Sequence, residues 1–532
     1  MTEITVGAVV AAMILVACGG EGRVPDSTGA TRPVPGAPGE VVGMNEAAKG
    51  DAGVVSPPPA GIDGPLVHGL AVDDVAIYQA VKVDLTKNGV PLTTLDVPLI
   101  ANRPALLRVF VRPQMGWQPR PVRARLTLDS GRPAKEIIVS VGGLSTDDQL
   151  SSTVNFNLDA ADVTTTFSWG VTLFEADVAA RGSGSTAEAR LPTDGSTAAL
   201  KADNAGAALK ITFVPIRYTG DGSEHLPDTS AAQLKFLTDA MFATYPVTRI
   251  DTTIRAPLDH PGVIDPMGNG WSSVLTDVCM ARQTDRPGRD VFYYGLLAPG
   301  SSFRAYCGNA CVSGIAALAN NPNQDSMRCS IGIGFTNMGS GVFLQEVAHT
   351  MGRQHAPCGP VSQPDPAFPY QGARIGTWGY DLVHQKLVDP TRTVDFMSYC
   401  SPVWISDYTF KNLRDWLGVV DALAPPVSRA ETGQTETIAP AWRVATLEAD
   451  GSIIWGDVVR FDVGAGGVAG GVDRLVTLRD SSGSWAAAEP AIFFPHSTTG
   501  GGTLLLPPST TSSAVSLSFD DEATPRPIIR RR

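Results

Sequence analysis

One short stretch of this 532-residue chain, QEVAHTMGRQH, contains residues whose types and spacing would allow them to bind a metal ion. Positions i and i+4 of a helix lie on the same face, so Gln345 and His349 could hold one ion. Glu346 lies one step round the helix, where its carboxylate could act as general base on a metal-bound water. Gly352 predicts the end of the helix, because glycine adopts a left-handed conformation at little cost. The turn would bring His355 back toward the same ion.

Chance is a poor explanation of this spacing. The chain has only seven histidines, and Glu, His, Gly and His would fall in this register by chance with odds of roughly one in a thousand. A second motif, DFMSYC (Asp395 to Cys400), follows 40 residues after His355. Together the two motifs resemble the metzincin clan of zinc metallopeptidases, which combine His-Glu-x-x-His-x-x-Gly-x-x-His with a downstream Met-turn.

The resemblance implies a zincin-like α/β catalytic domain and a role for each matching residue. His349 and His355 would be ligands of a Zn²⁺ cofactor, and Glu346 would be the catalytic base. Met397 would lie beneath the metal in the Met-turn, and Tyr399, two residues later, could approach the metal as a second catalytic group. The implied activity is a metalloendopeptidase that cleaves protein or peptide substrates with zinc-activated water.

One position departs from the family pattern, because Gln345 stands where the first histidine ligand is expected. An amide oxygen is a poorer zinc donor than imidazole, although the Gln side chain is long enough to reach. Three interpretations stay open: an active peptidase that binds zinc weakly, a metal-free protease-like binding protein, or a site completed by another residue such as His384. Retention of Glu346 favours catalysis, because a carboxylate on an apolar helix is costly without a role or partner.

Cysteine usage predicts disulfides in an oxidising compartment. Apart from Cys18, the six cysteines all lie between residues 279 and 400, and the sequence has no Cys-x-x-Cys pair for a structural zinc site. In the metzincin arrangement the third ligand and the Met-turn meet at the metal, which implies a Cys358–Cys400 disulfide. For the other four cysteines we expect Cys307–Cys311 and Cys279–Cys329, with other pairings left open.

The first residues are typical of an exported bacterial lipoprotein. An apolar run from Ile4 to Ala17 is too short to span a bilayer comfortably and predicts a signal peptide at residues 1–17. Leu15-Val16-Ala17-Cys18 resembles a lipobox, which implies lipidation of Cys18 and attachment to the cell envelope or surface, with release outside the cell as the alternative. The start MTEITV lacks the usual Lys or Arg, so a different start or a buried helix stays open.

Changes in composition and in hydrophobic pattern along the rest of the chain predict a multi-domain α+β protein. Residues 18–64 are a Pro/Gly-rich linker, and residues 65–205 alternate apolar and polar side chains, which predicts an antiparallel β-sandwich. Residues 206–425 mix buried strands with helices at 228–246, 340–352 and 406–423. Residues 436–520 predict a small β-domain with a hairpin at Asp450-Gly451, followed by a disordered basic tail, RPIIRRR.

A net charge of −12 argues against nucleic acid or an anionic membrane surface as the main partner. We expect contact with a membrane only through the N-terminal lipid, and a monomeric protein. The competing function from another class is adhesion or binding through the β-domains without catalysis.

Overall fold

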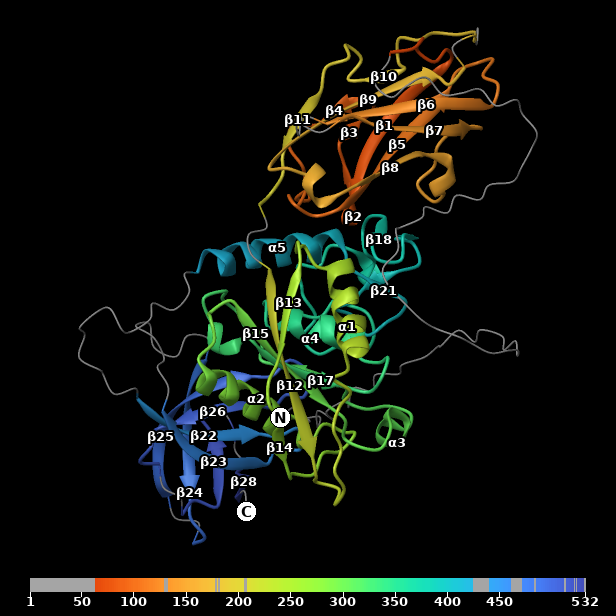
Figure 1. Ribbon diagram of the computed structural model, residues 1–532. Coiled ribbons are helices and arrows are strands. Elements are labelled where there is room, and N and C mark those ends of the chain that lie inside the picture. Colours follow the sequence, from red (N-terminus) through yellow and green to blue (C-terminus); the bar gives the residue numbers. More distant parts are fainter. Residues whose placement is uncertain are drawn as a thin grey trace, which may run out of the picture.

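The computed structural model (Figure 1) describes residues 63–530. It omits residues 129–132, 178, 180–181, 205–207, 424–439, 461–470, 483–484, 511–512, 521 and 523. The predicted signal peptide, Cys18 and nearly all of the predicted linker therefore lie outside the described residues. The predicted domain boundaries stay predictions.

The expected fold class is wrong, since the structure does not show the zincin-like α/β catalytic domain that the motifs implied. The described residues are mostly β, with 38% in strands and 17% in helices. The expected small C-terminal β-domain is a closed barrel of seven strands. Alternating side chains predict single strands, whereas barrel closure depends on strand pairings between distant residues that alternation does not encode.

Two antiparallel sheets at the N-terminal end face each other across one apolar core. The first contains, in spatial order, β19 (Lys386–Val388), β18 (Gly379–Asp381), β2 (Ala80–Asp84), β1 (Leu70–Tyr78), β5 (Ala105–Pro113) and β8 (Val154–Leu158). The second contains β10 (Arg190–Leu191), β9 (Thr166–Glu175), β6 (Arg120–Leu128) and β7 (Lys135–Val141), with β11 (Ala198–Lys201) beside β9. A small hairpin joins β3 (Thr86–Lys87) and β4 (Val90–Pro91).

The first sheet is shared between distant parts of the chain. β18 pairs antiparallel with β2, so residues near 380 extend a sheet built from residues near 80. The indole N–H of Trp404 also donates to the carbonyl of Ala80, at 2.9 Å. The N-terminal sheets are therefore joined to the central region by backbone pairing as well as by side chains.

The central sheet is mostly parallel. Its strands are β13 (Ile250–Ile254), β12 (Leu209–Tyr218), β15 (Val291–Leu297), β17 (Cys329–Ile333) and β16 (Gly314–Ala316), with β14 (Leu258–His260) also on β12. Only the edge strand β16 runs antiparallel, against β17. Beyond the sheet, β20 (Val394–Asp395) and β21 (Val403–Trp404) form a short parallel pair.

Five helices surround this sheet (Figure 1): α1 (Ala231–Thr244), α2 (Trp271–Asp285), α3 (Phe303–Cys307), α4 (Ser340–His349) and α5 (Asp407–Ala422). Four 3-10 turns are η1 (Leu150–Ser152), η2 (Ala160–Asp162), η3 (Asp325–Met327) and η4 (Gln371–Ala373). The three predicted helices are confirmed as α1, α4 and α5. Ser230 caps α1 by accepting from the backbone N–H of Gln233, because a serine oxygen can satisfy a free amide in the first turn.

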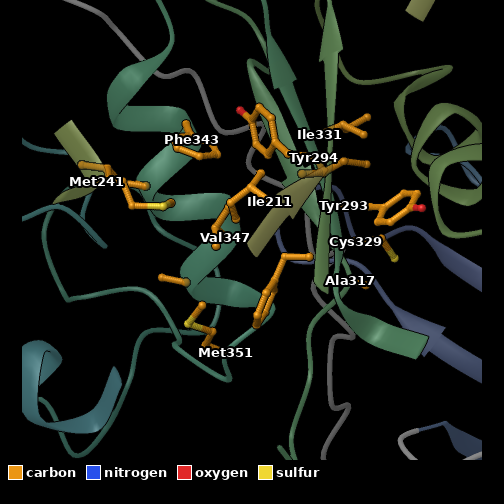
Figure 2. Close-up of a cluster of buried hydrophobic side chains, with 14 of the residues drawn as sticks. Ile211, Met241, Tyr293, Tyr294, Ala317, Cys329, Ile331, Phe343, Val347 and Met351 are labelled. Carbon is orange, nitrogen blue, oxygen red and sulfur yellow. The ribbon is translucent and has the colours of Figure 1, made fainter. Parts of the chain in front are cut away.

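Two helices cover opposite faces of the central sheet. Figure 2 shows Phe343 and Val347 of α4 beside Tyr294, on one face of the strands. Tyr293, the residue before Tyr294, points to the other face, as neighbouring strand residues do. α2 lies on that second face and is tied to β17 by the Cys279–Cys329 disulfide. The central sheet is therefore packed between α4 on one face and α2 on the other.

The barrel closes in the order β22 (Ala441–Leu447), β23 (Ile453–Arg460), β28 (Arg526–Arg530), β27 (Ser516–Phe519), β24 (Val472–Arg479), β25 (Trp485–Pro495) and β26 (Gly502–Leu506). The predicted hairpin is confirmed, with Gly451 at a φ of 83° between β22 and β23. The prediction of a disordered tail is wrong, because the tail forms β28. It pairs parallel with β23, and a parallel pairing between remote segments has no local turn signal.

The described residues contain no helix that has both the length and the apolar character needed to cross a membrane.

Candidate active site

Helix α4 carries three of the predicted site residues, Gln345, Glu346 and His349. Phe343 and Val347 are buried against the sheet (Figure 2). Glu346 and His349 are buried as well. Gly352 has a φ of 73°, and a Cβ there would meet the Trp416 ring at 2.6 Å. The left-handed glycine predicted after the helix is thus present, and any side chain would clash at this position.

His349 and His355 meet ring to ring. Their Nε2 atoms are 3.2 Å apart, and both side chains are buried. His349 Nδ1 lies 2.6 Å from the carbonyl oxygen of Arg353, and His355 Nδ1 lies 2.8 Å from that of Ser362. A carbonyl oxygen only accepts, so both Nδ1 atoms carry the hydrogen and both neutral rings present an Nε2 lone pair.

Burial keeps both imidazoles neutral. It lowers the pKa of His349 well below its usual range, and the nearby His355 adds to this effect. Burial also lowers the pKa of His355. Two facing lone pairs at 3.2 Å repel each other unless a cation lies between them. A proton or a metal cation between the two Nε2 atoms would remove this repulsion.

The donor set fits zinc. Two nitrogens bound at about 2.0–2.1 Å to one tetrahedral ion would be roughly 3.4 Å apart, close to the separation seen here. Within the described ranges, no cluster of three or more His, Cys, Asp or Glu side chains could hold a metal. In the sequence, Gln345 stands at the motif position of the first histidine, and an amide is outside that group of side chains.

Gln345 and Glu346 line a cavity of about 300 Å³. The Nε2 atom of Gln345 is buried without a hydrogen-bond partner among the described residues. Its amide is one of the few buried polar groups near the site left unsatisfied, which is costly in a closed site. A ligand in the cavity that accepts a hydrogen bond from this amide would remove that cost, whereas a cation could be held only through the Oε1 atom of Gln345.

Glu346 is buried and packs closely against β16. Its side chain is 3% exposed, and burial raises the pKa of its carboxyl to about 8, partly offset by a hydrogen bond from Ser497. Gly314 of β16 makes room for it, because a Cβ at that position would lie 2.8 Å from Glu346 Cγ. A carboxyl with this pKa can take up and release a proton near neutral pH, as a general base must.

Residues 395–400, where a Met-turn was expected, are tied to the segment that carries His355. The backbone N–H of Ala356 donates to the carbonyl of Met397 at 3.0 Å, and that of Tyr399 donates to Cys358 at 3.0 Å. The predicted Cys358–Cys400 disulfide is present and closes the same pair of segments. The Cys307–Cys311 and Cys279–Cys329 pairings are confirmed as well.

Asp395 organises the turn, a role the sequence reasoning missed. Its carboxylate is fully buried and accepts from the backbone N–H groups of Met397 at 2.8 Å and Ser406 at 2.9 Å. The Ser406 hydroxyl donates to the same carboxylate. An aspartate that accepts amides two residues on is a usual signal of a tight turn, so the DFM order could have indicated this role.

Tyr399 lies against the histidine pair. Its ring centroid is 4.9 Å from that of His355, in an edge-on arrangement. Burial and the nearby charge of Glu346 raise the pKa of Tyr399, and a hydrogen bond with Thr498 opposes this shift. Tyr399 therefore keeps its proton at neutral pH and can donate a hydrogen bond into the cavity that it lines.

His384 lies outside the cavity that Gln345 and Glu346 line. Its imidazole is 71% exposed and lies 2.8 Å from Asp381, and it lines a neighbouring cavity with Trp404. The structure thus groups Gln345, Glu346 and Tyr399 in one cavity beside the histidine pair, whereas His384 lies outside this group.

Two residues of the site come from the barrel and were missed from the sequence. Ser497 donates to Glu346 at 3.2 Å, and Thr498 lines the same cavity. They lie in the loop between β25 and β26, 151 residues after Glu346. No motif marks this loop, so no sequence signal could have placed it here.

Residues 311–401 match the family model described as Peptidase M66. The matched segment contains α4, His349, His355, Met397 and the Cys358–Cys400 disulfide. The match indicates a peptidase, and hence protein or peptide substrates, without identifying the metzincin clan. No curated protein matches the chain.

Proposed function

We propose that this protein is a zinc metalloendopeptidase whose site resembles that of metzincins in its ligand motif and Met-turn. The observation that carries the proposal is the 3.2 Å contact between the Nε2 atoms of His349 and His355, each with its Nδ1 hydrogen donated to a carbonyl. Two lone pairs held face to face in a buried site are arranged for a cation and for little else.

His349 and His355 would hold the metal through Nε2, and Gln345 would complete the protein ligands through Oε1. When bound, zinc supplies a water of lowered pKa and polarises the scissile carbonyl. The hydrogen bonds from Nδ1 to the carbonyls of Arg353 and Ser362 fix the tautomer and orientation of both rings. The Arg353 carbonyl lies in the turn after α4 and therefore depends on Gly352.

Glu346 is the proposed general base. Its pKa of about 8 means that the free carboxyl is partly protonated at neutral pH, and a cation beside it would favour the charged form. As carboxylate it accepts the proton of the attacking water, and it then delivers the proton to the leaving amine. Burial excludes bulk water from this transfer.

Tyr399 is the proposed hydrogen-bond donor to the oxygen of the scissile carbonyl. It lines the cavity with Glu346, and its raised pKa keeps the hydroxyl protonated. A donor aimed at the oxygen that gains negative charge stabilises the transition state more than the substrate. Loss of such a donor typically lowers kcat by about 10²–10³-fold.

The experiment is a comparison of zinc content and peptide cleavage. We expect the wild type to hold near one zinc per chain and to cleave a random-sequence peptide library. Glu346→Gln should keep zinc and lose cleavage, whereas Glu489→Gln, a substitution on the barrel strand β25, should keep both. Stoichiometric zinc without any cleavage would contradict catalysis. It would leave the alternative, a protease-like binding protein that is inactive because Gln345 replaces a histidine ligand.

We also propose that the protein acts outside the cytoplasm, anchored by lipid on Cys18 in a bacterial envelope. Three disulfides in the described residues support an oxidising compartment. Labelling with a radioactive fatty acid tests the anchor, because incorporation should be lost in Cys18→Ser. Equal incorporation in both proteins would contradict it.

A further inference from the structure

We propose that the loop between β25 and β26, residues 496–501, is a working part of the peptidase cleft, with Ser497 as the positioning residue of Glu346. This inference rests on the proposed function and extends it to the barrel. The barrel lies outside the segment that matches a peptidase family. We call residues 496–501 the barrel loop.

The barrel loop pairs with the outer edge of the central sheet. The backbone groups of Ser313 and Ala317 hydrogen bond to β17. Because the hydrogen-bonding direction alternates along a strand, the backbone N–H and C=O of Ala316 point away from β17, toward the free edge of the sheet. The backbone N–H of Ser497 donates to the carbonyl of Ala316 at 2.9 Å, and His496 bridges Ala317. The barrel loop thus occupies the edge of β16 where another extended chain could otherwise pair.

Ser497 joins this edge to Glu346. Its hydroxyl oxygen accepts from the backbone N–H of Ala316 at 3.0 Å. The same hydroxyl donates to Glu346 Oε2 at 3.2 Å, and it also lies 3.2 Å from Thr498 Oγ1. Among the described residues, no other hydrogen bond to the Glu346 carboxylate is seen. Ser497 is therefore what fixes the direction of this carboxylate.

Thr498 extends the same contact to the cavity. It hydrogen bonds with Tyr399 and lines the cavity with Gln345 and Glu346. A peptide in the cavity would therefore touch the barrel loop directly. Both proposed catalytic groups, Glu346 and Tyr399, depend on adjacent residues of one loop.

The barrel loop is itself held firmly by α2. His496 is buried, with Nδ1 3.1 Å from the hydroxyl of Ser272 and Nε2 3.2 Å from that of Thr503. Gly501 lies so close to this helix that a Cβ would meet Ser272 Oγ at 2.4 Å. Since α2 is tied to β17 by a disulfide, the barrel loop and the sheet cannot shift independently.

The test uses the full chain with three substitutions. Ser497→Ala removes the hydroxyl, Ser497→Thr keeps one, and Ser509→Ala changes an exposed serine elsewhere on the barrel. The substrate is a quenched fluorescent peptide selected on the wild type from a random-sequence library. Zinc content and thermal unfolding are measured for each protein, together with hydrogen exchange of the Ala316 amide.

We expect Ser497→Ala to lower kcat by about 10-fold or more with KM within about 2-fold, because the lost contact acts on the base rather than on peptide binding. Zinc content should be unchanged, and the Ala316 amide should exchange faster. Ser497→Thr should recover most of the lost kcat, and Ser509→Ala should match the wild type. A merely structural role would change zinc content or unfolding along with kcat.

The outcomes separate two failures. A wild type that cleaves peptides, together with an unchanged kcat in Ser497→Ala, would overturn the role of the barrel loop alone. An Ala316 amide that exchanges freely in the wild type would do the same, because the loop contact would then be absent in solution. A zinc-loaded wild type that cleaves no peptide would overturn the proposed function and this inference with it.

Discussion

Glu448 of the barrel caps the first turn of α2 at Ser273. Its carboxylate accepts from the backbone N–H of Ser273 at 2.9 Å and from that of Gly270 at 3.1 Å. The helix lacks a side-chain cap of its own, since its N-cap residue is a glycine. The barrel therefore completes a helix of the central region and, through it, fixes the barrel loop at the site.

Glu448→Ala should destabilise the protein by about 2–3 kcal/mol, because two buried amides lose their acceptor. Urea unfolding followed by tryptophan fluorescence measures this change. Asp457→Ala removes an exposed carboxylate from the same barrel and serves as the control. Equal midpoints for the two variants would contradict the capping role.

Gln345→His should tighten zinc binding by at least about 10-fold, because imidazole replaces a weak amide ligand. Competition with a chromophoric chelator measures the affinity. Gln371→His adds an imidazole at an exposed turn far from the cavity and should leave the affinity unchanged. If Gln345→His binds zinc no better than the wild type, Gln345 is not a ligand.

Removal of zinc should lower stability, because the facing Nε2 atoms of His349 and His355 then repel each other. A ligand that binds only the native state at 100 times its Kd contributes about 2.7 kcal/mol. Thermal unfolding with and without chelator gives the shift. The same chelator should produce no shift in a His349→Ala/His355→Ala variant, and a persistent shift there would place the metal elsewhere.

Loss of the Cys358–Cys400 bond should destabilise the protein more than loss of Cys307–Cys311. The two bonds span 42 and 4 residues, and loop entropy gives about 4 and about 2 kcal/mol. Paired Cys→Ser variants compared by urea unfolding test the order. The first variant should also lose kcat, since the Met-turn and the His355 segment are no longer tied together.

Acid should weaken the docking of the barrel through His496. Burial lowers the pKa of His496 to about 3, so between that value and about 6.5 the unfolded chain binds a proton that the native protein does not. Stability therefore falls as pH falls through this range, by about 2 kcal/mol at pH 5.

A His496→Gln variant should lack this part of the pH dependence, because its amide carries no titrating proton. Unfolding at pH 7 and pH 5 gives the difference for each protein. His384→Gln, which replaces an exposed imidazole, should behave as the wild type does. An identical pH dependence in wild type and His496→Gln would mean that the pKa of His496 is the same in the native and the unfolded protein, and would contradict this prediction.

The local parts of the site could be predicted from the sequence, because their signals lie within a few residues. The spacing of Glu346, His349 and His355 defines one helix and one turn, and Gly352 marks the point where they join. The pairing of Cys358 with Cys400 followed from family resemblance rather than from physical reasoning on the residues. The strand pattern also predicted a hairpin at Gly451.

The non-local parts could not be predicted. Ser497 reaches Glu346 only after the barrel has closed and docked, and alternation in β25 and β26 carries no information on that contact. The tail that forms β28 looked disordered because it is basic and short. It becomes ordered by pairing with β23, whose partners the sequence does not reveal. Strand pairing across long stretches of chain decided both outcomes.

The shared sheet bears on how this protein can be divided. A fragment that starts near residue 206 would contain β18 without β2, and the backbone groups of Gly379 and Tyr380 that pair with β2 would be exposed. Exposed strand edges readily pair with other copies of the same chain. A recombinant piece trimmed to the segment with the histidine pair would therefore aggregate through β18, whereas a piece that begins before β1 would stay dispersed.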